Sequence, residues 1–500
     1  MNSRSFSFLV LSAVLMLSAI SLAATYGGGS GTAEDPYQIW TPDQMNSIGI
    51  NSGDWSSCFK LMDDIDMSAY TGTQYKIIGT FRGTFDGNHH VIRNLTYSST
   101  TAITNIGLFG IANGATIVNL GLENINFSVA AQYVGGLAGQ LMSCTVTNCF
   151  TSGAITNSNT KELCVGGLAG YQHNGTITSC HSAGTVVGTM PSSSYSWNVY
   201  AGGLVGQQYI GIITHCLSSA DVTATSTGND AYAGGLVGYQ PGNICNISNS
   251  GSTGGVNAVN SYRSYAGGLI GYRVSSSNSL TNQCFSTGSV TASTTSRHAY
   301  AGGLIGYLEA PITDCFCTGS VTCSGKITYT GGLAGYATYA SLIRCYSTGL
   351  MTANATNTAY TGGSIGYRNS TNASKCFWDT VTSGLSNESG HADYTGGIYG
   401  ESTTQMKTEI TFTDMLWDFV DTWAICEKTN YPRLQWQIPA VDWLCPDGVN
   451  MEDFDYLVER WLRNDCSVLN DYCNGVDMNY SGSVDITEFA LFAQHWLEGI

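Results

Sequence analysis

Charge is what this sequence lacks most. Only 11% of its 500 residues are Asp, Glu, Lys or Arg, whereas globular proteins average about 25%. Lysine and arginine number 18 against 35 acids, which gives a formal net charge of −17. This balance excludes a nucleic-acid partner, because phosphate binding requires a basic surface. Apolar residues still make up 43% of the chain, so it is not of the charged, aromatic-poor type that stays disordered.

Long hydrophobic runs are also missing, with one exception at the N-terminus. Arg4 precedes an apolar stretch from Phe6 to Leu22, and the small residues Ser21 and Ala23 frame a cleavage site. We interpret residues 1–23 as a signal peptide, with an N-terminal anchor helix as the alternative. A membrane span needs about 20 apolar residues, and we find no second run. The mature chain is therefore predicted to lack a transmembrane segment and to be secreted or held at a cell surface.

Helical periodicity is absent from the middle of the chain, where a repeat takes its place. The octapeptide YAGGLIGY occurs at 265–272 and again at 300–307. Related copies recur every 29 to 36 residues, with the first glycine of each Gly-Gly pair at 135, 166, 202, 234, 267, 302, 331 and 362. A period of about 20–50 residues indicates units that stack on one another.

Each unit contains short pieces rich in Val, Ile, Thr and Tyr, separated by Gly, Ser and Asn, which indicate strands and turns. We predict a mainly β fold: a parallel β-helix solenoid over residues 106–400, with three strands per coil. Equivalent residues of successive coils then lie above one another. One interior ladder is predicted to contain Leu137, Leu168, Leu204, Leu236, Leu269, Leu304 and Leu333.

A second column of the repeat is built from cysteine. Seven cysteines and one serine follow an Ile-x-x-Cys pattern or its equivalent: Cys149, Cys180, Cys216, Ser250, Cys284, Cys315, Cys345 and Cys376. Because side chains alternate along a strand, an Ile and a Cys three residues apart both face inward only if a corner separates them. We interpret the column as buried thiols that fill space. Disulfides between neighbouring rungs are the alternative, which Ser250 disfavours.

The ends of the solenoid differ from its middle. Residues 24–105 are predicted to form an N-terminal cap and the first coils, with a helix that begins at Thr41, has Pro42 in its first turn and a capping box completed by Gln44. Residues 401–436 are predicted to form a C-terminal cap. It would contain a short helix at 403–412 and the aromatic cover Trp417, Phe419, Trp423 and Trp436.

Residues 437–500 are predicted to form a separate, small α-helical domain that binds Ca²⁺. The segment 477–488 matches the calcium-loop template, in which oxygens at fixed positions surround the ion and Gly482 makes the sharp turn. The predicted ligands are Asp477, Asn479, Ser481, Ser483, Asp485 and Glu488. A sister loop at 442–453 has Leu444 and Pro446 where ligands belong, so we predict weak binding or none there. Cys466 and Cys473 are placed to staple the two helices.

These motifs resemble two known families. The octapeptide units are similar to the GLUG-motif repeats of bacterial secreted and surface proteins, and the tail resembles a type I dockerin, a paired calcium-loop module that docks onto a cohesin. The resemblance implies an adhesin-like or matrix role. It also implies a cohesin-like protein or a cell-envelope component as partner.

Catalytic groupings are sparse. Between residues 131 and 375 the only acids are Glu162, Asp221, Asp230, Glu309 and Asp314, and no two share a column position in adjacent units. The densest acidic cluster, with Asp63, Asp64, Asp66 and Asp86, is interpreted as turn residues. We predict no catalytic residue and an exported, non-enzymatic scaffold that binds a glycan or a partner. The alternative is a polysaccharide-degrading lyase or glycosidase carrying a dockerin.

One column of tyrosines leaves two interpretations open. Its members either stack against sugar rings or pack the edges of the coils: Tyr171, Tyr239, Tyr272, Tyr307, Tyr336 and Tyr367.

Overall fold

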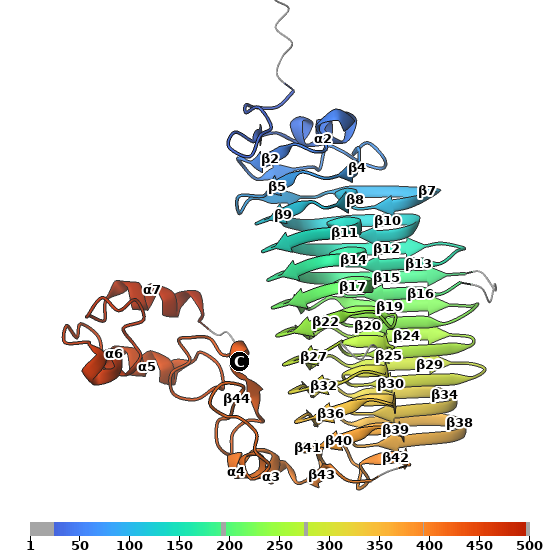
Figure 1. Ribbon diagram of the computed structural model, residues 1–500, viewed down its shortest axis with the longest axis vertical. Coiled ribbons are helices and arrows are strands. Elements are labelled where there is room, and N and C mark those ends of the chain that lie inside the picture. The colour runs from blue at the N-terminus through green and yellow to red at the C-terminus, as the bar shows by residue number, and fades with distance from the viewer. Residues whose placement is uncertain (1–24, 192–196, 275–278, 394, 497–500) are drawn as a thin grey trace, which may run out of the picture.

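The computed structural model describes residues 25–191, 197–274, 279–393 and 395–496. The predicted signal peptide lies outside this range. Figure 1 shows a long rod of stacked coils with a small helical module beside it. The rod is a parallel β-solenoid of about 10 turns. Among the described residues, no helix is long and apolar enough to cross a membrane.

The strands of the rod form two parallel sheets that follow its axis. One sheet contains β1 (Tyr37–Ile39), β2 (Cys58–Leu61), β4 (Ile78–Phe81), β5 (Thr84–Asp86), β8 (Phe109–Asn113), β9 (Thr116–Val118), β11 (Ala138–Thr147), β14 (Ala169–Thr178), β17 (Val205–Thr214), β21 (Val237–Gln240), β22 (Cys245–Ser248), β26 (Ile270–Arg273), β27 (Thr281–Asn282), β31 (Ile305–Leu308), β32 (Ile312–Thr313), β35 (Ala334–Thr338), β36 (Ser341–Ile343), β39 (Ile365–Asn369), β40 (Asn372–Ser374) and β42 (Ser389–Ala392).

The other sheet wraps the remaining faces. It contains β3 (Ile65–Asp66), β6 (Val91–Arg93), β7 (Thr96–Ile106), β10 (Gly121–Gly135), β12 (Phe150–Ser158), β13 (Leu163–Gly166), β15 (His181–Met190), β16 (Val199–Gly202), β18 (Leu217–Ser218), β19 (Asp221–Ser226), β20 (Ala231–Gly234), β23 (Gly251–Ser252), β24 (Val256–Asn260), β25 (Arg263–Gly267), β28 (Phe285–Ser286), β29 (Val290–Thr294), β30 (His298–Gly302), β33 (Phe316–Cys317), β34 (Val321–Gly331), β37 (Tyr346–Ser347), β38 (Met351–Gly362), β41 (Cys376–Asp379) and β43 (Ile398–Glu401).

Equivalent residues of successive coils pair in register, as predicted. In the two identical octapeptides Tyr265 pairs with Tyr300 and Gly267 with Gly302. The leucine ladder is continuous, because the amide of each leucine donates to the carbonyl of the next, from Leu137 through Leu333. All seven leucines are fully buried.

The corner that the cysteine column requires is present in every one of these coils. The residue just before each cysteine has left-handed backbone geometry, for example φ 52° at His215 and 51° at Gln283. The chain turns there, so that Ile213 and Cys216 are both buried. Corners and tight turns also break the predicted three strands into shorter pieces: the coil that follows β20 contains five, β21 to β25.

The paired glycines allow neighbouring backbones to touch. A Cβ atom on Gly267 would overlap the carbonyl oxygen of Ile270 and the amide nitrogen of Gly306 in the next coil. One on Gly268 would overlap the carbonyl of Gly303 and the hydroxyl of Ser286. The same close contact between backbones recurs in each coil of the repeat, which explains why glycine recurs at these two positions.

The N-terminal helix α2 (Pro42–Ile50) begins as predicted. Thr41 Oγ1 accepts from the amide of Gln44 at 3.3 Å. The capping box differs by one residue, because Gln44 Oε1 accepts from the amide of Trp40 at 2.7 Å rather than from Thr41. The short 3₁₀ helix η1 (Ser52–Asp54) follows.

The C-terminal cap differs from the prediction in two ways. The single helix expected at 403–412 is two, α3 (Thr403–Met406) and α4 (Glu409–Thr413). The aromatic residues that follow do not cover the open end of the rod. They run back along its flank in a strap (residues 402–437), which includes the antiparallel pair β44 (Trp423–Ala424) and β45 (Arg433–Leu434) and the 3₁₀ helix η2 (Gln435–Gln437).

The strap packs on the flank because it buries the apolar surface of a column of aromatic side chains there. Phe285, Phe316, Tyr346 and Phe377 stack in successive rungs and share one apolar cluster with the strap. Indole N–H groups fix the strap to the corners of the coils: Trp436 donates to Gln283 O at 3.0 Å, Trp423 to Asp314 Oδ1 at 3.2 Å and Trp417 to Lys375 O at 2.9 Å.

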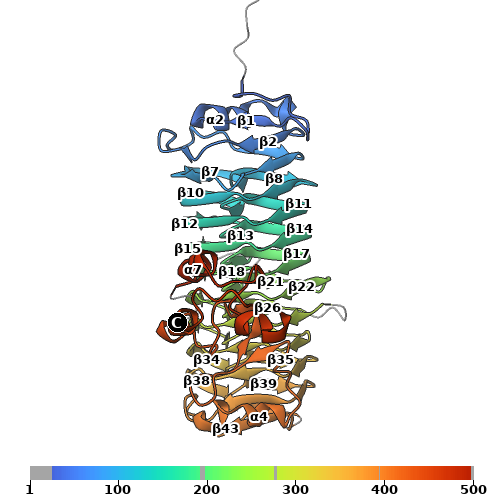
Figure 2. The same ribbon diagram turned by 90° about the vertical axis from the view of Figure 1, so that its left-hand side faces the viewer.

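The C-terminal module contains α5 (Met451–Glu459), the 3₁₀ helix η3 (Val468–Asn470), α6 (Asp471–Asn474) and α7 (Ile486–Gln494). It has its own apolar core, with Val449, Leu457 and Val484 fully buried. A disulfide joins Cys466 to Cys473, as predicted, and a second joins Cys445 to Cys426 of the strap. Figures 1 and 2 place the module beside the flank that carries the strap.

Candidate functional site

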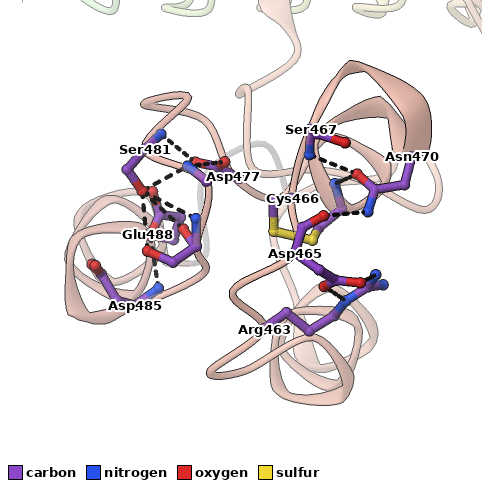
Figure 3. Close-up of a disulfide and its surroundings, with 12 residues drawn as sticks. Arg463, Asp465, Cys466, Ser467, Asn470, Asp477, Ser481, Asp485 and Glu488 are labelled. Carbon is purple, nitrogen blue, oxygen red and sulfur yellow. Dashed lines mark hydrogen bonds and ion pairs between the residues drawn. A yellow bond between two sulfur atoms is a disulfide. The ribbon is translucent and has the colours of Figure 1, made fainter.

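The predicted calcium loop folds around the carboxylate of Asp477. Its Oδ1 accepts from the amide of Ser481 at 3.0 Å and its Oδ2 from that of Gly482 at 2.9 Å. Gly482 has φ 89°, which makes the predicted sharp turn without a Cβ clash. Figure 3 shows Asp477, Ser481 and Glu488 gathered in one loop, apart from the Cys466–Cys473 disulfide.

Glu488 closes the loop from the first turn of α7. One oxygen, Oε2, accepts from the amide of Asp485 at 2.9 Å, whereas the other, Oε1, is buried with no hydrogen-bond partner. Asp485 caps the helix, with Oδ1 accepting from the amide of Thr487 at 2.8 Å. That backbone hydrogen bond lowers the pKa of the Asp485 carboxyl.

The loop has the chemistry that a hard cation requires. Asp477 and Glu488 are 1% and 0% exposed, and within the described part of the chain neither carboxylate forms an ion pair. Burying two anions without a counter-charge is costly. Ca²⁺ takes about 6–8 oxygen ligands, and the loop also carries Asn479, Ser481 and Ser483. The residues therefore fit calcium.

The sister loop at 442–453 uses its oxygens differently. Both carboxylate oxygens of Asp453 accept hydrogen bonds from backbone amides, those of Trp443, Leu444 and Asn450. Asp442 keeps one buried oxygen without a partner, and burial raises the pKa of its carboxyl to about 6. A disulfide at Cys445 ties this loop to the strap. Weak or absent calcium binding at this loop stays a prediction.

The acids at the N-terminal end of the rod serve as turn and rung partners. Asp64 lies 3.0 Å from Arg93 and accepts from the amide of Val91. Asp66 Oδ1 accepts from Asn94 at 2.9 Å. Asp86 lies 3.7 Å from Lys60, and Asp63 accepts from the next amide. These contacts support the structural interpretation of the cluster.

Four of the five acids of the repeats, and the histidines, also have local structural partners. Asp230 pairs with Arg263 at 2.8 Å and Asp314 with Arg344 at 2.7 Å, while Glu309 accepts from the hydroxyl of Tyr307. Three of the histidines contact aromatic neighbours: His173 stacks on Tyr209, His181 on Phe150, and His298 meets the hydroxyl of Tyr300. Asp221 Oδ1 accepts from the amide of Gly255, one rung along.

Two tyrosine columns stand side by side where one was predicted. The outer column is the predicted one, and the inner column contains the tyrosines that precede the Gly-Gly pairs: Tyr200, Tyr232, Tyr265, Tyr300, Tyr329 and Tyr360. Its signal in the sequence is the first letter of YAGG. From Tyr265 to Tyr329 in the inner column and from Tyr272 to Tyr367 in the outer one the rings lie nearly parallel, with centroids 4.6 Å apart for Tyr265 and Tyr300. Neighbouring rings thus cover one another's faces, which favours coil packing over sugar stacking.

The cysteine column consists of buried thiols, as predicted. Thirteen cysteines are free and all except Cys58 are buried. The four paired cysteines lie outside the repeats, so the alternative of disulfides between rungs is wrong for the described residues. The aromatic column on the flank was not predicted, although its signal is present in the sequence: an aromatic residue directly follows Cys284, Cys315, Cys345 and Cys376.

Comparison with known proteins supports the repeat assignment. The family model of the GLUG motif matches residues 130–156 and 162–187. The chain carries GLUG motifs. Halomucin of Haloquadratum walsbyi is 32% identical over 155 residues, which cover 28% of this chain and 2% of that protein. A "Putative Gly-rich membrane protein" of Evansella cellulosilytica is 32% identical over 127 residues, 23% of this chain and 14% of that protein.

The chain thus matches only small parts of these two relatives. Among solved structures, a chain described as "a putative immunoglobulin A1 protease" from Bacteroides ovatus aligns with a TM-score of 0.35 and 17% identity, over 82% of this chain and 96% of that one.

Proposed function

We propose that the chain is an extracellular, non-catalytic β-helix scaffold whose C-terminal module holds calcium and attaches the rod to a partner. The observation that carries this proposal is a difference between the buried carboxylates of the rod and those of the loop at 477–488 in whether their oxygens have hydrogen-bond or ion-pair partners. On the described part of the rod, each buried carboxylate has a partner: Asp230 pairs with Arg263, Asp314 pairs with Arg344, and Asp379 accepts from the amide of Val381 and the hydroxyl of Tyr431. In the loop at 477–488, two carboxylates are buried and one oxygen of Glu488 has no partner.

The calcium part of the proposal assigns a role to each ligand. Asp477 and Glu488 supply the buried charge, Asn479 and Ser481 supply side-chain oxygens, and Ser483 supplies its carbonyl. Asp485 reaches the ion directly or through water. Bound calcium would join the loop to the start of α7, so that binding energy stabilises the module.

An attachment surface is available on the same module. Apolar side chains of α5 and α7 are open to solvent: Met451 is 57% exposed, Val458 51% and Ile486 68%. Exposed apolar patches mark interaction sites. We propose that this face meets a cohesin-like protein or a cell-envelope component, with calcium keeping the two helices in place.

The test is a pull-down from the envelope of the parent cell, with and without chelator, using the full chain and its Glu488→Gln variant. The proposal expects a partner that is retained only with calcium and only by the unmodified chain. The proposal would be refuted if the partner were retained equally with and without chelator and equally by both chains.

A second assay separates the scaffold from the polysaccharide-degrading alternative. Purified protein is incubated with plant and algal polysaccharides, and new chain ends are measured. The scaffold proposal expects none. Turnover that disappears in Asp63→Asn or Asp86→Asn would reverse it in favour of an enzyme.

A further inference from the structure

A groove runs along the flank of the rod, beside the strap. Two hollows of about 470 and 430 Å³ form it, and they adjoin at Thr253, which lines both. The upper hollow is lined by His181, His215 and Leu217, and the lower one by the rod and the strap residues Tyr431 and Arg433. We call this the flank groove. Figure 2 views the rod from the side that carries β18, whose residues Leu217 and Ser218 line the upper hollow.

A row of hydroxyl groups follows the flank groove. Ser219, Thr253, Thr287 and Thr318 occupy one position in successive coils, because each amide donates to the coil before, as Thr253 does to Ser218 O at 2.9 Å. Successive hydroxyls are therefore about 4.8 Å apart. Ser219, Thr253 and Thr287 are exposed, and none of their hydroxyls bonds to another described residue. The row is free to bind a ligand with a repeat along the rod axis.

The middle of the flank groove lies where the aromatic column is interrupted. In the aromatic column Leu217 pairs with Gly251, and Gly251 pairs with Phe285. The ring of Phe285 leans over Gly251, because a Cβ atom there would overlap it. The aromatic cover of the strap ends at the same level, where Trp436 lies 5.8 Å from Phe285. The flank groove is thus open above this point and walled by the strap below it.

The flank groove lacks the acids that predominate in the chain as a whole. The protein has a net charge of −17, but the described lining residues include no Asp or Glu, and Arg433 at the strap end is their one permanently charged side chain. His181 and His215 line the other end, and burial lowers the pKa of His181, so its imidazole is neutral at pH 7. A ligand with negative groups is therefore favoured at the strap end of the flank groove.

We propose that the flank groove binds a linear anionic polysaccharide that runs along the rod axis. The hydroxyl row meets the sugar hydroxyls, Arg433 meets a carboxylate or sulfate group, and the two histidines offer ring nitrogens for hydrogen bonds to the sugar. An extended peptide is a poorer occupant. Backbone amides on the floor already bond between coils, as Thr287 does to Ser252 O, so no strand edge is free to pair with it. This inference rests on the scaffold proposal and names its glycan ligand.

Affinity gel electrophoresis of the full chain tests the inference. The gels contain alginate or polygalacturonate as carboxylated probes, carrageenan as a sulfated probe, or hydroxyethyl cellulose as a neutral control. Thr253→Trp fills the junction of the two hollows, and Arg433→Gln removes the fixed charge. Thr101→Trp, an exposed threonine at the far end of the rod, is the matched control, and circular dichroism verifies that each variant folds.

The inference predicts retardation by at least one anionic probe, with retardation lost in Thr253→Trp, reduced at least about threefold in Arg433→Gln and unchanged in Thr101→Trp. No retardation by any probe, equal retardation by hydroxyethyl cellulose, or an unaffected Thr253→Trp would each overturn it. Cleavage of a bound probe would instead refute the scaffold proposal, while the assignment of the flank groove as the polysaccharide-binding site would still hold.

Discussion

Tyr307 lies flat on Tyr272, with ring centroids 4.5 Å apart and planes inclined by 2°. The next ring, Tyr336, follows at 5.0 Å and 3°. Across the two columns the rings meet edge to face, as Tyr265 and Tyr272 do at 82°. Each such pair contributes about 0.5–1.5 kcal/mol beyond its area. The tyrosines therefore hold the coils in register.

The first prediction concerns alkaline pH. Burial raises the pKa of the stacked tyrosines, to about 12 for Tyr329. Below the ordinary value of about 10 their contribution to stability is fully present, because both states are protonated. Above it the unfolded chain loses protons first, so stability falls as pH rises towards the folded value.

We expect tyrosinate absorbance and loss of circular dichroism to appear together in a steep transition above about pH 10. If most tyrosines ionised smoothly while the circular dichroism stayed native, the packed stack would be refuted.

The second prediction concerns the paired glycines. Gly267→Ala forces a methyl group against the backbone of its own coil and of the next, so we expect a loss of at least about 2 kcal/mol in the free energy of unfolding. Gly53→Ala is the matched control, because nothing lies within 4 Å of the position of its Cβ. Denaturant unfolding measures both variants, and equal stabilities would contradict close contact between the coils.

The third prediction concerns thiols. The sequence has 17 cysteines, of which four are in disulfides, so 13 should react with a thiol reagent when the protein is unfolded without reductant. In the native protein only Cys58, the one free cysteine that is not buried, should react quickly. A count below about nine would require bridges between rungs, as loss of each pair removes two thiols.

The fourth prediction concerns calcium. Calorimetry should show one clear site, and Glu488→Gln should weaken it at least about tenfold by removing a carboxylate ligand. Glu459→Gln, whose side chain is 74% exposed on the same module, should bind normally. Two equal sites would contradict the account of the loop at 442–453.

The repeat could be predicted because its cause is local and recurs. A leucine such as Leu269 recurs at one position in each coil, so the regular spacing of leucines in the sequence predicts the ladder. The strap could not be predicted in the same way. The indole of Trp423 meets Asp314 across 109 residues, and Cys426 pairs with Cys445 rather than with any of the repeat cysteines. Such contacts have no periodic signal in the sequence.

The candidate calcium site was predictable because its ligands lie within twelve residues of template spacing. The flank groove was not. It depends on Gly251 interrupting an aromatic column and on Arg433 approaching from the strap, and only the folded chain brings those two residues to one surface.

The most direct test of the stacked register is a distance along the rod. Thr147 and Ser374 bound an eight-residue stretch of one column of paired residues: Thr147, Thr178, Thr214, Ser248, Asn282, Thr313, Ile343 and Ser374. Pulsed electron paramagnetic resonance can measure this separation between spin labels attached through non-natural amino acids, which leaves the native thiols unlabelled. Seven steps of about 4.8 Å predict a single narrow distance near 34 Å. A broad distribution, or a mean far from that value, would contradict the parallel solenoid.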